Sequence, residues 1–245
     1  MSVARHGSGA TGALRALASQ IHPVFMLPPV AASAFGAVLA REFDPGLAVL
    51  HMAVAFCALY TAHVKDGYVD FHVRGEDDDH PLTATGCRFA LALSSGLFFV
   101  GLLAITVLVG PVAGLITLPG WLIGYLHAPQ LDTNPVTTTT GYPLGIGFAL
   151  LGGFYVQTRT LTAVVLAFAL VFVLVLSGIK VIDDAKDYEY DRSVAKHTVA
   201  VVLGRERART AAFLLMVTGL LVVVALAVVS VFPPSSVLAA LAFGV

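Results

Sequence analysis

Long apolar runs recur along the sequence and constrain the fold more than any other feature. A helix needs about 20 apolar residues to cross a bilayer, and helices or closed barrels are the structures that can satisfy their backbone polar groups in lipid. The mean hydropathy of +0.88 and the charged fraction of 12% leave too little polar surface for a soluble domain. Seven runs, bounded by Gly, Pro and charged residues, lie at about 23–41, 46–63, 88–108, 110–127, 143–158, 161–181 and 210–232. The sequence therefore predicts an all-α, polytopic transmembrane bundle.

The two ends of the chain lack a complete apolar run. Residues 1–21 mix Arg, His and Gly, which predicts a short cytoplasmic lead-in and not a cleaved signal. An eighth apolar run begins near Ser236 and stops at Val245, too short to cross a bilayer. We expect seven to eight spans in a single membrane domain over residues 1–245, with a C-terminus that is truncated or interfacial.

The basic residues predict the orientation in the membrane. With the N-terminus inside, twelve Lys and Arg residues fall on the cytoplasmic side, and only Arg41 and Arg159 fall outside. This orientation places the segments 63–88 and 181–209 on the cytoplasmic side, after the second and sixth runs. Eleven of the fifteen acidic residues lie in two short stretches of these segments, 66–79 and 183–191. Their similar organisation indicates two similar halves around a central cavity.

The first acidic segment contains Asp66 and Asp70, four residues apart. On a helix this spacing puts both carboxylates on one face, where they repel each other unless a cation lies between them. A hard divalent cation such as Mg²⁺ is the usual partner of such oxygen ligands. The run Glu76 to Asp79 follows a glycine, and we interpret it as a solvated turn.

The second acidic segment contains Asp184, Asp187 and Asp191, at spacings of three and four that predict one helical face. Asp183 is expected to point about 100° away around the helix axis. Carboxylates beside the bilayer are costly and tend to be functional. Metal and basic residues would reverse the local charge so that a diphosphate can bind; the candidate cations are Lys65, Arg74, Lys186 and Lys196.

These motifs resemble those of the UbiA superfamily of intramembrane prenyltransferases. Asp66-x-x-x-Asp70 is similar to the family's first motif, with Arg74 where a third acid often stands. The stretch from Asp184 through Asp191-Arg192 to Leu203-Gly204 is similar to the second motif. The resemblance departs in two respects: family members usually have nine helices, and the loop 127–142 carries no Lys or Arg.

The resemblance implies Mg²⁺-dependent transfer of a polyprenyl group from its diphosphate to a lipophilic acceptor in the membrane, with no nucleic-acid partner. Mg²⁺ and basic side chains would stabilise the departing diphosphate, and aromatic faces such as Tyr68 and Tyr188 could stabilise an allylic cation. Candidate acceptor contacts are His22, Asp132 and Asn134. The acceptor could belong to quinone, ether-lipid or carotenoid biosynthesis.

Two other membrane functions would also use acidic clusters. A cation-coupled transporter could use the acidic clusters as an ion site, but such ligands usually lie near the midplane on broken helices. A CDP-alcohol phosphatidyltransferase needs Asp-Gly-x-x-Ala-Arg, whereas Asp66-Gly67 is followed by Tyr-Val-Asp-Phe. The transporter remains the alternative.

Overall fold

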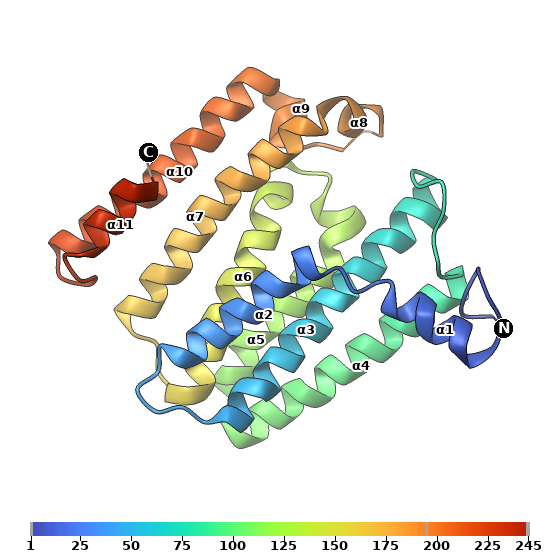
Figure 1. Ribbon diagram of the computed structural model, residues 1–245, viewed down its shortest axis with the longest axis horizontal. Coiled ribbons are helices and arrows are strands. Elements are labelled where there is room, and N and C mark those ends of the chain that lie inside the picture. Colours follow the sequence, from blue (N-terminus) through green and yellow to red (C-terminus); the bar gives the residue numbers. More distant parts are fainter. Residues whose placement is uncertain (1, 195, 244–245) are drawn as a thin grey trace.

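The computed structural model describes residues 2–194 and 196–243, and its regular elements in this part of the chain are helices (Figure 1). Of these, η1 is wound as a π-helix, and the short η2 is kinked at Ala128, whose φ of −120° and ψ of 137° are not helical. One isolated bridge pairs Ala4 with Leu82. The elements are α1 (Gly9–Ala18), α2 (Pro23–Val38), α3 (Pro45–Gly67), η1 (Tyr68–Arg74), α4 (Ala84–Leu108), α5 (Pro111–Leu126), η2 (His127–Leu131), α6 (Pro135–Thr158), α7 (Ala163–Lys186), α8 (Tyr188–Ser193), α9 (Val199–Leu203), α10 (Arg205–Val228) and α11 (Ser236–Phe243).

Capping residues and prolines set where the long helices begin. The Asp44 carboxylate accepts from the backbone N–H of Leu47 at the start of α3, and Thr83 and Thr162 cap α4 and α7 in the same way. Proline occupies the first position of α2, α3, α5 and α6, where its missing N–H costs nothing.

All seven predicted runs lie on helices, but fewer helices meet the requirements for a span. In the described part of the chain, α3 with η1, α4, α7 and α10 are each long and apolar enough to cross a membrane. The short α2 qualifies only together with α1, across a bend of 67°. Helix α5 has only 16 residues, and Thr and Gly lower the hydropathy of the 24-residue α6. The expected all-α membrane bundle is confirmed, with four or five such spans instead of seven to eight.

Small residues let the helices approach closely. A Cβ on Gly36 of α2 would lie 2.1 Å from the carbonyl oxygen of Leu150 in α6, and one on Gly153 would lie 2.1 Å from the carbonyl oxygen of Ser33. In lipid, where the hydrophobic effect does not drive helices together, such close van der Waals packing stabilises the bundle. The α2–α6 pair therefore forms a tight interface in the centre of the molecule (Figure 1).

Buried hydrogen bonds also join the helices. Ser33 Oγ of α2 lies 2.7 Å from His51 Nδ1 of α3, and Thr61 Oγ1 of α3 lies 2.8 Å from Ser94 Oγ of α4. Interhelical bonds of this kind contribute on the order of 1 kcal/mol each in a membrane. They fix α3, which carries the first acidic motif, against both of its neighbours.

The outer surface of α4 is apolar. Leu93, Leu97, Val100, Leu103 and Val107 are all exposed and recur every three or four residues on one helix face. A contiguous exposed apolar stripe of this length is rare on soluble monomers. It matches a surface that faces lipid.

Candidate active site

The polar connections after α3, α5 and α7 meet at one end of the bundle (Figure 1). Arg74 at the end of η1 pairs with Asp132 after η2, with contacts of 2.6 and 3.0 Å. His197 Nδ1 lies 3.1 Å from the Thr133 carbonyl oxygen, and Tyr190 donates to Glu76 at 3.5 Å. The predicted location of both acidic segments on the same side is therefore confirmed.

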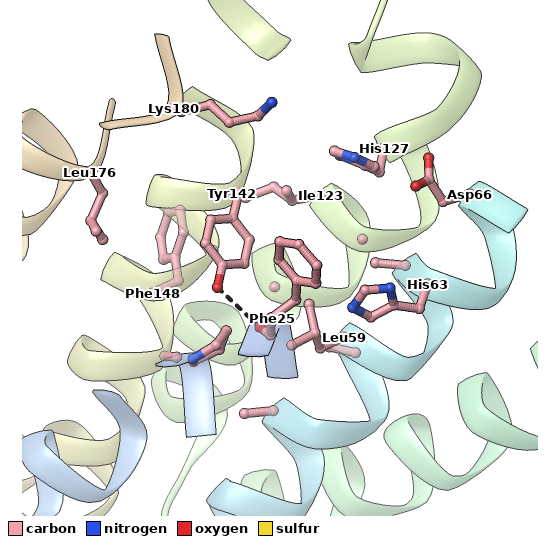
Figure 2. A pocket seen from close by; sticks show the side chains of 18 of the residues that line it. Phe25, Leu59, His63, Asp66, Ile123, His127, Tyr142, Phe148, Leu176 and Lys180 are labelled. Atoms are coloured by element: carbon pink, nitrogen blue, oxygen red, sulfur yellow. Dashed lines mark hydrogen bonds between the residues drawn. The ribbon is translucent and has the colours of Figure 1, made fainter. Parts of the chain in front are cut away.

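Beneath these connections lies a cavity of about 550 Å³. Its walls are mainly apolar and aromatic, and include Phe25, Ile123 and Phe148. Figure 2 shows Asp66 of α3 and Lys180 of α7 approaching the same end of the cavity from different walls, with His127 beside Asp66. The cavity is thus apolar along its walls and charged at one end.

The first acidic segment is wound differently from the prediction. Helix α3 ends at Gly67, and the chain continues as the π-helical η1, which takes more residues per turn than an α-helix. Four residues span slightly more than one turn of an α-helix and slightly less than one turn of a π-helix, so Asp66 and Asp70 stay on roughly the same side of the chain. Asp66 lines the cavity, whereas the Asp70 side chain lies among cations at the end of the bundle. Against the lowering effect of burial, both carboxylates nonetheless help to raise the pKa of Lys196, so the helix type differs from the prediction while the two acids remain near one cation.

Those cations form a network with several carboxylates. Arg74 lies 3.5 Å from Asp70 and 3.6 Å from Glu76, besides its paired contacts to Asp132. Lys196 lies 3.9 Å from Asp70 and 3.3 Å from Glu76. The Glu76 side chain is only 4% exposed, so its interpretation as part of a solvated turn was wrong. Asp77, Asp78 and Asp79 are exposed, as expected.

Gly75 explains why Glu76 is buried. It adopts φ 67°, a left-handed conformation that favours glycine, and reverses the chain after η1. The backbone N–H of Glu76 then donates to the Asp70 carbonyl oxygen at 2.7 Å. The turn folds Glu76 back onto Arg74 and Lys196.

The second acidic segment is not one continuous helix. Helix α7 ends at Lys186, and Asp187 has φ −92° and ψ 13° between α7 and α8. Asp184 is buried and pairs with Lys180 one turn earlier, while Asp183 lines the cavity. The three motif acids therefore lie on two helices and at the break between them, not on one helical face, although burial, Asp184 and Asp187 all raise the pKa of Asp191. Asp183 is exposed and pairs with Lys186, so it points away from the buried Asp184, as predicted.

Lys196 connects the two segments electrostatically. Burial lowers the pKa of its ammonium group, but Asp70, Glu76 and Asp66 outweigh this effect and raise the pKa above its usual value. Burial raises the pKa of Asp191, and the Asp184 carboxylate raises it further, while Lys196 acts in the opposite direction. The carboxylates of both segments thus share one electrostatic environment.

Comparison with known proteins identifies the family. The family model described as the UbiA prenyltransferase family matches residues 26–245. The chain belongs to the UbiA prenyltransferase family. It is accordingly an integral membrane protein, as its apolar helices indicate.

Individual UbiA relatives share the fold at low sequence identity. A UbiA homolog from Archaeoglobus fulgidus, solved bound to GPP and Mg²⁺, superposes with a TM-score of 0.75 at 17% identity, covering 95% of this chain and 85% of that one. An apo UbiA homolog from Aeropyrum pernix gives 0.73 at 16% identity, covering 90% and 86%. Digeranylgeranylglyceryl phosphate synthase from Methanoregula boonei is 28% identical over 169 residues. That match spans 67% of this chain and 60% of the relative.

The acidic residues of this UbiA chain fit a hard divalent cation. Among the residues that the structure describes, Asp70 Oδ1 and Asp184 Oδ2 are buried and have no hydrogen-bond partner, although Arg74 lies 3.5 Å from Asp70 Oδ1. Buried carboxylate oxygens without partners are costly, and Mg²⁺ prefers a few carboxylates combined with phosphate oxygens. The donor set Asp66, Asp70, Asp184, Asp187 and Asp191 therefore suits Mg²⁺.

The predicted aromatic residues do not lie along the cavity. Tyr68 packs beside His72, with ring centroids 5.6 Å apart, and its hydroxyl accepts from Arg88 at 3.4 Å. Tyr188 packs under Arg205 near α9 and α10. The aromatic side chains that line the cavity are Phe25, Phe98, Tyr142 and Phe148. Tyr142 also donates to the Phe25 carbonyl oxygen at 3.0 Å, which links α6 to α2 (Figure 2).

The remaining predicted residues occupy varied positions. Lys65 lies over the Tyr125 ring at 5.2 Å, and the exposed Lys186 pairs with Asp183 at 3.0 Å. The His22 ring is 5.3 Å from that of His63, which lines the cavity. Asn134 caps α6 through the Val136 N–H.

Sequence reasoning missed several charged and polar residues near the cavity. Lys180 stands four residues before Asp184, and His63 stands three residues before Asp66, so each shares a helix side with a motif acid. Those spacings could have identified both residues. His127 has no comparable signal, because it follows an apolar run that carries no acidic motif.

Proposed function

We propose that this chain catalyses Mg²⁺-dependent transfer of a polyprenyl group from its diphosphate to a lipophilic acceptor within the membrane. The observation that supports this most strongly is the cavity with apolar walls and a charged end, capped by two acidic segments. An isoprenoid tail suits the apolar walls, and a metal-bound diphosphate suits the charged end. Transporters usually place ion ligands near the membrane midplane, which these segments do not match.

The side chains at the charged end would bind and orient the diphosphate. Bound Mg²⁺ would neutralise charge that gathers on the departing diphosphate. The aspartates of both segments would hold the ion, and Lys180 and Lys196 would contact phosphate oxygens. In the reaction, the bond between the allylic carbon and the diphosphate oxygen breaks, the same carbon bonds to the acceptor, and the acceptor loses a proton. The apolar walls would exclude water from the allylic cation.

The acceptor is proposed to be a prenylated glyceryl phosphate lipid. The support is the similarity to the Methanoregula boonei protein, whose name describes a synthase of digeranylgeranylglyceryl phosphate. Aromatic quinone precursors and carotenoids are the competing acceptor classes. We further propose that the N-terminus and both acidic segments face the cytoplasm, because the basic residues concentrate on that side.

The decisive experiment incubates membranes containing the chain with labelled geranylgeranyl diphosphate, Mg²⁺ and one acceptor at a time: a prenylated glyceryl phosphate, a dihydroxynaphthoate or a carotenoid. We expect a labelled ether lipid that disappears when a chelator removes Mg²⁺. Label on a different acceptor would overturn the acceptor assignment. No transfer to any acceptor, together with cation flux into liposomes that contain the chain, would favour the transporter.

A further inference from the structure

A second group of side chains, of the types that bind metal ions, lies outside the cavity. His72 comes from η1, His80 from the connection 75–83, and Cys87 from the first turn of α4. One ligand atom from each residue lies within 4.8 Å of the other two. None of the three lines the cavity. The group is therefore separate from the proposed diphosphate site.

Two of the three donors are buried, and His72 is partly buried. Cys87 is fully buried and His80 is 5% exposed. The His80 ring stacks on Phe71 at 5.8 Å, and it fits against α3 because a Cβ on Gly67 would lie 2.6 Å from His80 Nε2. On the outer side, the Ala4–Leu82 bridge closes over the connection. This enclosure resembles a structural metal site more than a solvated surface cluster.

The distances are close to those of a tetrahedral metal centre. Cys87 Sγ lies 3.9 Å from His80 Nδ1. Ligand bonds of about 2.3 Å to sulfur and 2.0–2.1 Å to nitrogen place two tetrahedral donors about 3.5 Å apart. Small side-chain rotations would therefore bring the thiolate and the two imidazoles to bonding distance.

The Leu82 peptide group lies beside both rings. Its carbonyl oxygen lies 3.1 Å from His72 Nε2 and 3.2 Å from His80 Nδ1, and its N–H donates to His80 Nδ1 at 3.2 Å. A single ring nitrogen cannot donate to the carbonyl and accept from the N–H at once. The two hydrogen bonds between His80 Nδ1 and the Leu82 peptide group therefore cannot form at the same time.

We propose that His72, His80 and Cys87 bind a divalent transition metal of the zinc class and thereby fasten the connection 75–83 to η1 and α4. A set of two imidazoles and one thiolate suits Zn²⁺ and is a poor match for Mg²⁺, which takes oxygen ligands. Water or the Leu82 carbonyl oxygen would complete the coordination. Because η1 also carries Asp70, the metal would hold the first acidic segment in place.

The test uses the purified full chain, without an affinity tag, in detergent and with excess Mg²⁺ to saturate the carboxylates. Titration with Co²⁺, a spectroscopic substitute for Zn²⁺, should produce a thiolate-to-cobalt charge-transfer band in the near ultraviolet at one equivalent. Cys87→Ser should abolish the band. His80→Gln removes a direct ligand and should weaken Co²⁺ binding by more than about 100-fold, which is the largest loss typical of removing a residue that only hydrogen-bonds to a ligand. Cys57→Ser, which removes the other cysteine, should leave the band unchanged.

A second measurement covers the case in which Cys87→Ser does not fold. In the Cys57→Ser background, Cys87 is alkylated during mild heating with and without Zn²⁺. The proposal predicts that Zn²⁺ slows alkylation at least tenfold and that Mg²⁺ has no effect. Absence of the charge-transfer band, or a band that persists in Cys87→Ser, would overturn the proposal. Equal alkylation with and without Zn²⁺ would also overturn it.

Discussion

The two acidic segments follow apolar helices of similar length, 23 and 24 residues, yet their surroundings differ. In the first segment, Asp70 faces Arg74, four residues later in η1, and Lys196 of the second segment, and it shares both cations with Glu76. In the second, Asp184 is paired with Lys180 of its own helix. The first segment therefore combines a local pair with long-range pairs to Lys196 and Asp132, whereas the buried Asp184 has a local pair beside a helix break at Asp187.

Because their partners differ, we expect some of these cations to act mainly on the stability of the fold and others mainly on substrate binding. Arg74 is engaged by three carboxylates, one of them in the connection after η2, so its removal should mainly loosen the end of the bundle. Lys180 lines the cavity and should mainly affect binding of the diphosphate. The following predictions use the contrast, beginning with the largest effect.

Asp70→Asn and Asp187→Asn should each lower prenyl transfer by about 10²–10³-fold, because each removes charge that holds the metal and the departing diphosphate. Transfer is measured in membranes with labelled geranylgeranyl diphosphate. The matched control is Asp78→Asn, which neutralises an exposed acid in the same connection and should retain full activity. Wild-type rates in both site variants would refute the assignment of these aspartates.

Arg74→Ala should destabilise the protein by about 3 kcal/mol, because it leaves the buried Asp132 without its paired partner. Unfolding in detergent is followed by circular dichroism. Lys186→Ala removes an exposed pair and should change stability by less than about 0.5 kcal/mol. Equal effects of the two variants would contradict the distinction between the long-range and local ion pairs.

Lys180→Ala should weaken binding of the diphosphate by roughly 10- to 100-fold, the value of a hydrogen bond to a charged group. Lys186→Ala should leave binding unchanged, since Lys186 is exposed and does not line the cavity. Calorimetric titration with a prenyl diphosphate in excess Mg²⁺ measures both constants. If Lys186→Ala has the larger effect, the diphosphate lies outside the described cavity.

Asp79→Asn should produce the smallest change. Arg5 lies 2.8 Å and His6 2.9 Å from the Asp79 carboxylate. The interaction with His6, more than that with Arg5, keeps the pKa of Asp79 below its usual value. These pairs are exposed, so we expect a modest, salt-sensitive rise in amide hydrogen exchange at residues 3–5. The backbone hydrogen bonds that join residues 3–5 to Pro81 and Thr83 should remain. Complete loss of amide protection at residues 3–5 would show that the ion pairs, and not these hydrogen bonds, hold the segment in place.

The sequence predicted the helices better than the site. Apolar runs located α4 and α7 because lipid-facing helices need continuous apolar residues, and the run at 161–181 matches α7 with only its polar last turn missing. The start of α6 was missed because its first turns are rich in Thr.

The site depends on irregular backbone that side-chain spacing does not reveal. No Gly or Pro marks the helix break at Asp187, and the spacing of Asp66 and Asp70 does not reveal the change to π-winding at Tyr68. Long-range ion pairs, such as that of Arg74 with Asp132, depend on how the loops meet in space. The sequence predicted a diphosphate contact for Arg74 and an acceptor contact for Asp132, but not the contact between them.

The most direct test of the central claim, that both acidic segments act on one metal-bound diphosphate, is a double-mutant cycle on binding. Calorimetry with geranylgeranyl diphosphate and Mg²⁺ compares Asp70→Asn, Asp187→Asn and the combined variant. Because residues that hold the same ligand are energetically coupled, the combined variant should bind about as weakly as the weaker single variant. A combined loss equal to the product of the two single losses would show independent sites and contradict the account.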